Sequence, residues 1–159
     1  MAIPRAATVL LLACLLLVAG CASTPARDDA LYRALGERSG IEALVETLLL
    51  RVSDDPRIAH HFADVDIIHL NDRLVEFLCV QSGGPCAYAG KPMAEAHKHV
   101  EVGEADFNAL VEDLMWAMDQ RQLPRTTQNR LLRRLAAMQG DVVRRGPPPP
   151  EAPLLPRQP

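Results

Sequence analysis

Apolar residues recur every three or four positions along most of this 159-residue chain. The recurring sets are Ile41, Leu44, Val45, Leu48 and Val52; Ile67, Leu70, Leu74, Phe77 and Leu78; Phe107, Leu110, Val111, Leu114, Met115 and Met118; and Leu131, Leu132, Leu135, Met138 and Val142. This spacing places each set on one face of an α-helix, and no run alternates as a half-buried strand does. The sequence therefore predicts an all-α fold with these faces turned inward.

Capping and breaking residues mark where these helices should begin and end. The expected caps are Asp28 or Asp29 for a first short helix through Glu37, a capping box at residues 39–42, Asp66, and Thr126 or Thr127. The expected breakers are Pro56, the "SGGP" turn at residues 82–85, and Pro124. A further short helix should follow Pro92.

The opening stretch "MAIPRAATVLLLACLLLVAGCAST" has the form of an export signal, because Arg5 precedes an apolar run over residues 6–19 that is short for a bilayer span. "VAGC" resembles the lipobox of bacterial lipoproteins, which implies that residues 1–20 are a signal peptide and that Cys21 is lipidated. We therefore expect a membrane-anchored protein facing the periplasm, with residues 21–27 as a tether. Ala22 after the cysteine points to the outer membrane. A retained transmembrane anchor and ordinary secretion are the alternatives.

The other end of the chain is rich in proline, with seven prolines among residues 146–159. Such a segment favours extended conformations and is expected to be a disordered tail, leaving one domain at residues 28–145. Without residues 1–20 the chain has 16 basic and 20 acidic groups, a formal charge of −4. It contains no run of lysine or arginine, so we expect no nucleic-acid partner.

The cysteines fall into separate roles. Cys14 leaves with the signal and Cys21 takes the lipid, so Cys79 and Cys86 are left as a pair in an oxidising compartment. A disulfide between them would close a small loop and contribute roughly 2.5 kcal/mol. Zinc binding would need two more ligands, and none is suitably spaced.

Several motifs occur together in the order and spacing of the group I truncated haemoglobins. They are "LYRALG", "IEALVETLLLRVSDDPRIAHHF", "EFL", "GGP", "YAGKPM" and "AHKHVEVGEADFNALVEDL". The resemblance covers Leu31 to about Val143 and rests on the joint order, since no single motif is diagnostic. It implies a small all-α haem protein with a two-over-two helical sandwich.

The resemblance assigns the haem ligand within "HKHVEV". His97 stands ten residues before Phe107, as the family's proximal histidine does, so it is expected to bind the iron of haem b and leave the sixth position open for a small gas. His99, two residues on, would point about 200° away around a helix and is expected to be a bystander. Without the resemblance, both would be interpreted as solvated side chains.

Other pocket residues follow from the same resemblance. Phe62 matches a phenylalanine that packs flat on the haem, although an ordinary core role fits it as well. Lys91 either pairs with a haem propionate or is simply exposed. His60 and His61 offer an alternative metal site, but adjacent residues diverge on a helix and no further ligand joins them. Residues expected in the pocket or the core are Phe77, Leu78, Tyr88, Met93, Val102, Phe107 and Trp116.

The chain departs from the family where the bound gas is expected to lie. Leu48 and Leu49 replace a Phe-Tyr pair whose hydroxyl hydrogen-bonds the gas, and Leu74 replaces a glutamine. Leu70 lies one turn earlier. With no donor on this side, tight oxygen storage and nitric-oxide dioxygenation are in doubt, because bound O₂ carries partial negative charge.

The combined prediction is a lipid-anchored truncated globin that binds O₂, CO or NO at haem, with a redox or sensing role outside the cytoplasm. The sequence names no redox partner. One alternative is a haem enzyme with peroxidase or nitric-oxide chemistry, which would need a distal acid–base residue that the sequence does not supply. The other is a helical lipoprotein that has lost haem and serves as a scaffold.

Overall fold

All regular secondary structure in residues 28–143, the part of the chain that the computed structural model describes, is helical. The elements are α2 (Ala30–Ala34), α3 (Glu37–Asp54), the 3₁₀-helix η1 (Ala59–Phe62), α4 (Ile67–Gln81), α5 (Met93–Ala96), α6 (Glu104–Gln120), α7 (Arg125–Ala136) and α8 (Gln139–Val142). The all-α prediction is confirmed. The expected signal, tether and proline-rich tail lie outside the described residues.

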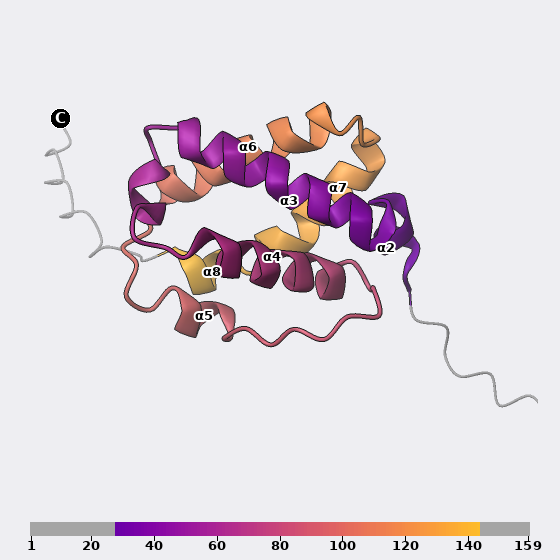
Figure 1. Ribbon diagram of the computed structural model, residues 1–159, viewed down its shortest axis with the longest axis horizontal. Helices are drawn as coiled ribbons and strands as arrows, with labels where there is room; N and C mark the ends of the chain where they lie inside the picture. The colour runs from indigo at the N-terminus through magenta and orange to yellow at the C-terminus, as the bar shows by residue number, and fades with distance from the viewer. Residues whose placement is uncertain (1–27, 144–159) are drawn as a thin grey trace, which may run out of the picture.

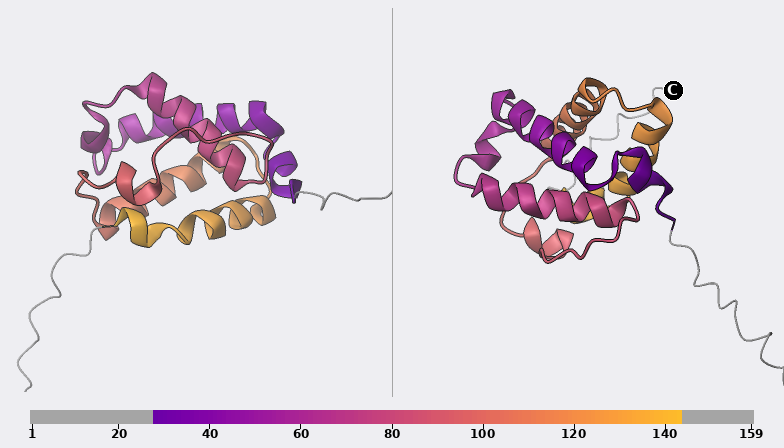
Figure 2. Two further views of the ribbon diagram at one scale, coloured as in Figure 1. Left: turned by 90° about the horizontal axis from the view of Figure 1, so that it is seen from below. Right: turned by 45° about the vertical axis from the view of Figure 1, so that its right-hand side comes forward.

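Helix α3 is the centre of the arrangement, because it packs against both α4 and α6 (Figure 1). Helix α2 packs against α3 and α7, and α5 packs against α8 (Figure 2). Full burial of a leucine, isoleucine or valine contributes roughly 1.5–3 kcal/mol, so these contacts stabilise the bundle. Among residues 28–143, no helix is both long and apolar enough to cross a membrane. The side chains buried between the helices include Leu31, Ile41, Leu44, Val45, Val75, Ala117, Met118 and Leu131.

The helix ends agree with the sequence in part. Asp66 caps α4 as expected, since its Oδ1 accepts a hydrogen bond from the backbone N–H of His69 at 3.0 Å. The capping box at residues 39–42 is wrong, because α3 already begins at Glu37 and Ser39 donates its hydroxyl to the carbonyl of Gly36. Gly36 has φ 86°, a left-handed conformation that glycine adopts at little cost, so α3 can start directly after α2.

The last helix also differs from its prediction. Helix α7 begins at Arg125 behind Pro124, whose carbonyl accepts the backbone N–H of Thr127. Neither Thr126 nor Thr127 is therefore the cap. A proline is tolerated at the start of a helix, so α7 can begin directly after Pro124. The helix ends at Ala136, and Val142 lies on the separate short helix α8. The first helix is likewise shorter than expected, because α2 ends before Glu37.

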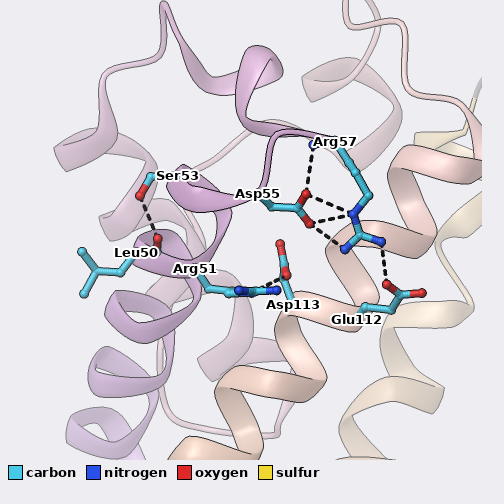
Figure 3. A network of polar contacts seen from close by, with 7 residues as sticks. All are labelled: Leu50, Arg51, Ser53, Asp55, Arg57, Glu112 and Asp113. Atoms are coloured by element: carbon cyan, nitrogen blue, oxygen red, sulfur yellow. Dashed lines mark hydrogen bonds and ion pairs between the residues drawn. The ribbon is translucent and has the colours of Figure 1, made fainter.

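A polar network fastens the end of α3 to α6 (Figure 3). Arg57 donates to both carboxylate oxygens of Asp55 and reaches Glu112 on α6 at 2.7 Å. Next to it, Arg51 of α3 donates to the buried Asp113 of α6 at 2.9 Å. Hydrogen bonds from Arg57 lower the pKa of Asp55 to about 2, whereas burial raises the pKa of Asp113. The network thus fixes the turn that leads from α3 towards η1.

Candidate functional site

His97 follows directly after the short helix α5, and its ring is oriented by that helix. Its Nδ1 lies 2.9 Å from the carbonyl oxygen of Met93, one turn earlier. A carbonyl only accepts hydrogen bonds, so Nδ1 carries a proton, and in the neutral imidazole Nε2 then keeps a free lone pair. A metal-ligating histidine typically donates its other ring N–H in this way. The half-buried His97 is therefore prepared to bind a metal through Nε2, whereas His99 is exposed.

Helix α4 has two apolar faces. Val75 and Cys79 are buried towards the core, at 2% and 0% exposure. Leu70, Leu74 and Phe77 recur at intervals of four and three residues on a second face, and all three remain half-buried. This second face is only partly covered by the protein itself, so it suits a flat apolar ligand. Leu78, expected in the pocket or the core, is buried with 5% exposure.

The segment of residues 82–92, here called the strap, runs back along α4 and leads to α5 (Figure 1). Its contacts with α4 follow one another along that helix, starting near the helix end. Cys86 forms a disulfide with Cys79, the Tyr88 ring lies edge-on to Phe77 with centroids 5.6 Å apart, and the Ala89 N–H donates to Glu76 at 3.1 Å. The predicted disulfide is confirmed, and the strap connects the second face of α4 to the histidine.

Close packing shapes the end of the strap. A Cβ atom at Gly90 would lie 2.2 Å from the Tyr88 ring, so a larger residue at that position would displace the ring. The Tyr88 hydroxyl donates to the carbonyl of Lys91 at 3.1 Å. The ammonium group of Lys91 is exposed and lies 4.0 Å from Glu95, which leaves both predicted roles of this lysine open. Met93, at the start of α5, is half-buried.

Phe62 and Leu49 come together at one cavity. This cavity of about 220 Å³ lies between the end of α3, η1 and the start of α4. Its lining is mostly apolar, and the residues are Leu49, Val52, Ser53, Ala59, Phe62, Ala63 and Ile67. The structure therefore places the leucine that replaces the family's tyrosine in the same small space as the phenylalanine expected to pack on the haem.

Arg73 is a polar residue of this region that the sequence analysis did not single out. It is half-buried on α4, and its Nη2 pairs with Oε1 of Glu76 at 2.7 Å. Its Nε is buried and has no hydrogen-bond partner among residues 28–143. The sequence could have indicated Arg73, because a charged residue stands there three residues after Leu70 and next to Leu74 on an otherwise apolar face.

The two histidines of η1 serve a different purpose from the metal site considered above. His61 Nε2 lies 3.4 Å from Oδ2 of Asp106, and the same carboxylate accepts the N–H of Gly103 at 2.9 Å. The hydrogen bond from Gly103 is the main cause that lowers the pKa of Asp106. Within residues 28–143, the His, Cys, Asp and Glu side chains form no group of three that could hold a metal ion. His61 Nε2 has no hydrogen-bond partner among residues 28–143, so its nearness to Asp106 only places η1, which carries Phe62, beside the start of α6.

Residues of α6 and of the segment before it divide into two groups. Val102 and Phe107 are half-buried, as a pocket or core role requires. Trp116 is 41% exposed and the guanidinium of Arg51 lies 5.3 Å from its ring centroid, so the prediction that it lines the pocket or core is wrong. Met115, expected to face inward, is 37% exposed. Both lie on the solvent side of α6, away from the buried Ala117 and Met118.

Comparisons with known proteins give a consistent result. Residues 30–144 match the family model of bacterial-like globins. The chain is 30% identical over 113 residues to a group 1 truncated haemoglobin of Nostoc sp., covering 71% of this chain and 96% of that protein. It is 36% identical over 99 residues to one from Synechocystis sp., covering 59% and 79%. The crystal structure of truncated haemoglobin from Tetrahymena pyriformis in its Fe(III) form superposes with a TM-score of 0.70 and 27% identity, covering 72% and 98%.

Proposed function

Because the chain belongs to the bacterial-like globins and is a group 1 truncated haemoglobin, we propose that it binds haem b through Nε2 of His97 and takes a small diatomic ligand at the haem. The observation that carries the proposal is the hydrogen bond from Nδ1 of His97 to Met93, which leaves Nε2 free. Bound haem supplies an iron atom whose sixth position accepts O₂, CO or NO.

The side chains on the second face of α4 fit such a group. Leu70, Leu74 and Phe77 offer a half-covered apolar face on α4, and contact with a large apolar ring system would remove that face from water. The strap leads from α4 to His97, and the Cys79–Cys86 bond ties the strap to α4. The exposed ammonium group of Lys91 supports its proposed pairing with a haem propionate.

We propose that the side of the haem on which the gas binds is poor in hydrogen-bond donors. Leu49, Leu70 and Leu74 cannot donate to a bound gas, and the cavity beside Leu49 is mostly apolar. Such a pocket supports binding of CO or NO and brief binding of O₂, in a redox or sensing role, better than tight storage of O₂. Arg73 is the nearby donor that experiments must exclude, because its Nε has no partner.

We also propose that Cys21 is lipidated after removal of residues 1–20, so that the globin domain works outside the cytoplasm on the surface of a membrane. The support is the apolar run before "VAGC" and the disulfide, a bond that persists in exported proteins. Ala22 favours the outer membrane of a double-membraned bacterium.

Absorption spectroscopy of the purified protein, with and without added hemin, tests the haem proposal. A Soret band that saturates at one hemin per chain is expected. If no band appears even with excess hemin, the chain is a haem-free helical scaffold and the proposed function is wrong. Spectra under CO and after reduction then report whether the sixth position accepts a gas.

A further inference from the structure

Helix α7 carries a concentration of positive charge that the haem chemistry does not use. Residues 28–143 contain 19 acidic and 12 basic residues, yet the twelve residues of α7 include four arginines and no acidic residue. These arginines are Arg125, Arg130, Arg133 and Arg134. The rest of the domain is therefore strongly acidic, and α7 stands out as the most strongly cationic helix among the described residues.

The arginines lie away from the buried face of α7, which is formed by Thr127, Gln128 and Leu131. Arg134 is the most covered of them, because it donates a hydrogen bond to the carbonyl of Gln81 at the end of α4. Arg133 is exposed, and the side chains of Arg130 and Arg134 are 40% and 34% exposed. We call Arg130, Arg133 and Arg134 the α7 arginine face. Arg133 makes no ion pair with a residue of 28–143, so its charge is available to a partner.

This face lies next to the point where the described chain begins. Arg130 and Arg134 lie 4.0 and 3.6 Å from the carboxylate of Asp28, and α2 packs against α7 (Figure 2). Asp28 is seven residues after Cys21. Seven residues span at most about 25 Å when fully extended. A lipid on Cys21 therefore keeps the α7 arginine face within that distance of the membrane surface.

We propose that the α7 arginine face docks the domain onto anionic lipid headgroups of the membrane that holds Cys21. The proposal rests on the lipid anchor proposed above. Arginine pairs with phosphate through two parallel hydrogen bonds, and basic residues close to an anionic membrane are attracted to it. The short tether raises the effective concentration of headgroups at this face, while the acidic remainder of the domain is repelled. The domain is thereby held in one orientation.

The test measures access to one position on α7 in the lipidated holoprotein. Asn129 is exposed on α7, and Asp54 is exposed at the far end of α3, so Asn129→Cys and Asp54→Cys form a pair for comparison. Each variant is placed in phosphatidylcholine vesicles with or without 30% phosphatidylglycerol, a composition chosen as roughly that of an anionic bilayer. A membrane-impermeant maleimide then reports the labelling rate.

We expect labelling at position 129 to slow at least about fivefold in the anionic vesicles at low salt and to recover at high salt, because screening weakens the attraction. Labelling at position 54 should not change with lipid. Adding Arg133→Glu to Asn129→Cys should restore fast labelling, whereas adding Arg38→Glu, the same charge change on α3, should not.

The proposal would be overturned if labelling at position 129 slowed equally in neutral and anionic vesicles. It would also be overturned if labelling did not slow at all in protein whose lipid had been verified by mass spectrometry. A mass without lipid would overturn the anchor and this docking mode together, and the Soret band reports separately on the haem site. A failure of the docking alone, of the anchor or of the haem site can therefore be told apart.

Discussion

The Nδ1 atom of His97 lies within hydrogen-bonding distance of the carbonyl oxygen of Met93, so the neutral ring offers the lone pair of Nε2 to a ligand. This relationship separates His97 from His99, which is exposed two residues later. His97→Ala should therefore abolish or severely weaken haem retention, whereas His99→Ala should leave the Soret band unchanged. In His97→Gly, added imidazole should partly restore the band. Equal losses in the two alanine variants would show that the ligand is assigned to the wrong residue.

The leucine at position 49 predicts the kinetics of gas release. CO is nearly apolar and should bind normally, but O₂ without a donor loses about 1–3 kcal/mol, by analogy with hydrogen bonds to charged groups. O₂ should therefore leave roughly five- to hundredfold faster than from a relative with tyrosine at this position. Leu49→Tyr should slow the release, as measured by flash photolysis and stopped flow.

Arg73→Leu is the control for that experiment, and it should change O₂ release little. Slow release from the wild-type protein that becomes fast in Arg73→Leu would mean that the unpartnered Nε of Arg73 serves the ligand, and the view of a pocket without a donor would be wrong.

The disulfide should stabilise the fold without being required for it. Cys86→Ser removes the bond and leaves the fully buried Cys79 in place. The loop-entropy model predicts a loss of roughly 2.5 kcal/mol in the free energy of unfolding. Urea denaturation measures this loss, and the wild-type protein in dithiothreitol should behave as the variant does. Two thiols that react with iodoacetamide in the native oxidised protein would contradict the pairing.

Asp55 should make stability depend on acid pH. Its pKa in the folded protein is about 2, lowered from 3.8 chiefly by hydrogen bonds from Arg57. A lowered carboxyl pKa stabilises the fold above the unfolded value, and the effect is lost as the pH falls towards the folded value. Asp55→Asn should therefore lower Tm by several degrees at pH 7, and the difference from wild type should shrink between pH 4 and pH 2. Helix content by circular dichroism follows both proteins, and a difference that persists at pH 2 would exclude this cause.

Cys21 should decide where the protein resides. The wild-type protein should sediment with membranes in its native host, and Cys21→Ser should remain unprocessed at the length of the full chain. Mass spectrometry of the membrane fraction should find a mature chain beginning at lipidated Cys21. A soluble wild-type protein that keeps residues 1–20 would exclude lipid anchoring.

Much of the fold could be predicted because its determinants are local. The apolar spacing of the helices, the cap at Asp66 and the disulfide over a short loop each depend on residues close in sequence. The capping box at residues 39–42 failed because Gly36 turns the chain sharply enough for α3 to start earlier. Gly36 and the capping box at residues 39–42 are two possible starts for this helix, and the left-handed conformation of Gly36 is visible only in the structure.

The site could be predicted less completely because it combines distant segments. His97 was assigned through the family resemblance, and its bond to Met93 is a local contact of one helical turn. Trp116 was misplaced because its apolar ring suggested burial, while its actual partner, Arg51, comes from a helix 65 residues earlier. The missing hydrogen bond of Arg73 likewise depends on how the surrounding side chains pack, which the sequence does not specify.

The strap also bears on the order in which the protein matures. Cys79 and Cys86 lie only seven positions apart, so the loop between them closes with little loss of chain entropy and needs no distant contact. If the chain is exported as proposed above, the bond can form as soon as it enters an oxidising compartment, before any cofactor arrives. The second face of α4 and the strap would then be joined in the newly exported chain, so haem would meet a receptor that is already half assembled, and its capture would complete the maturation of the protein.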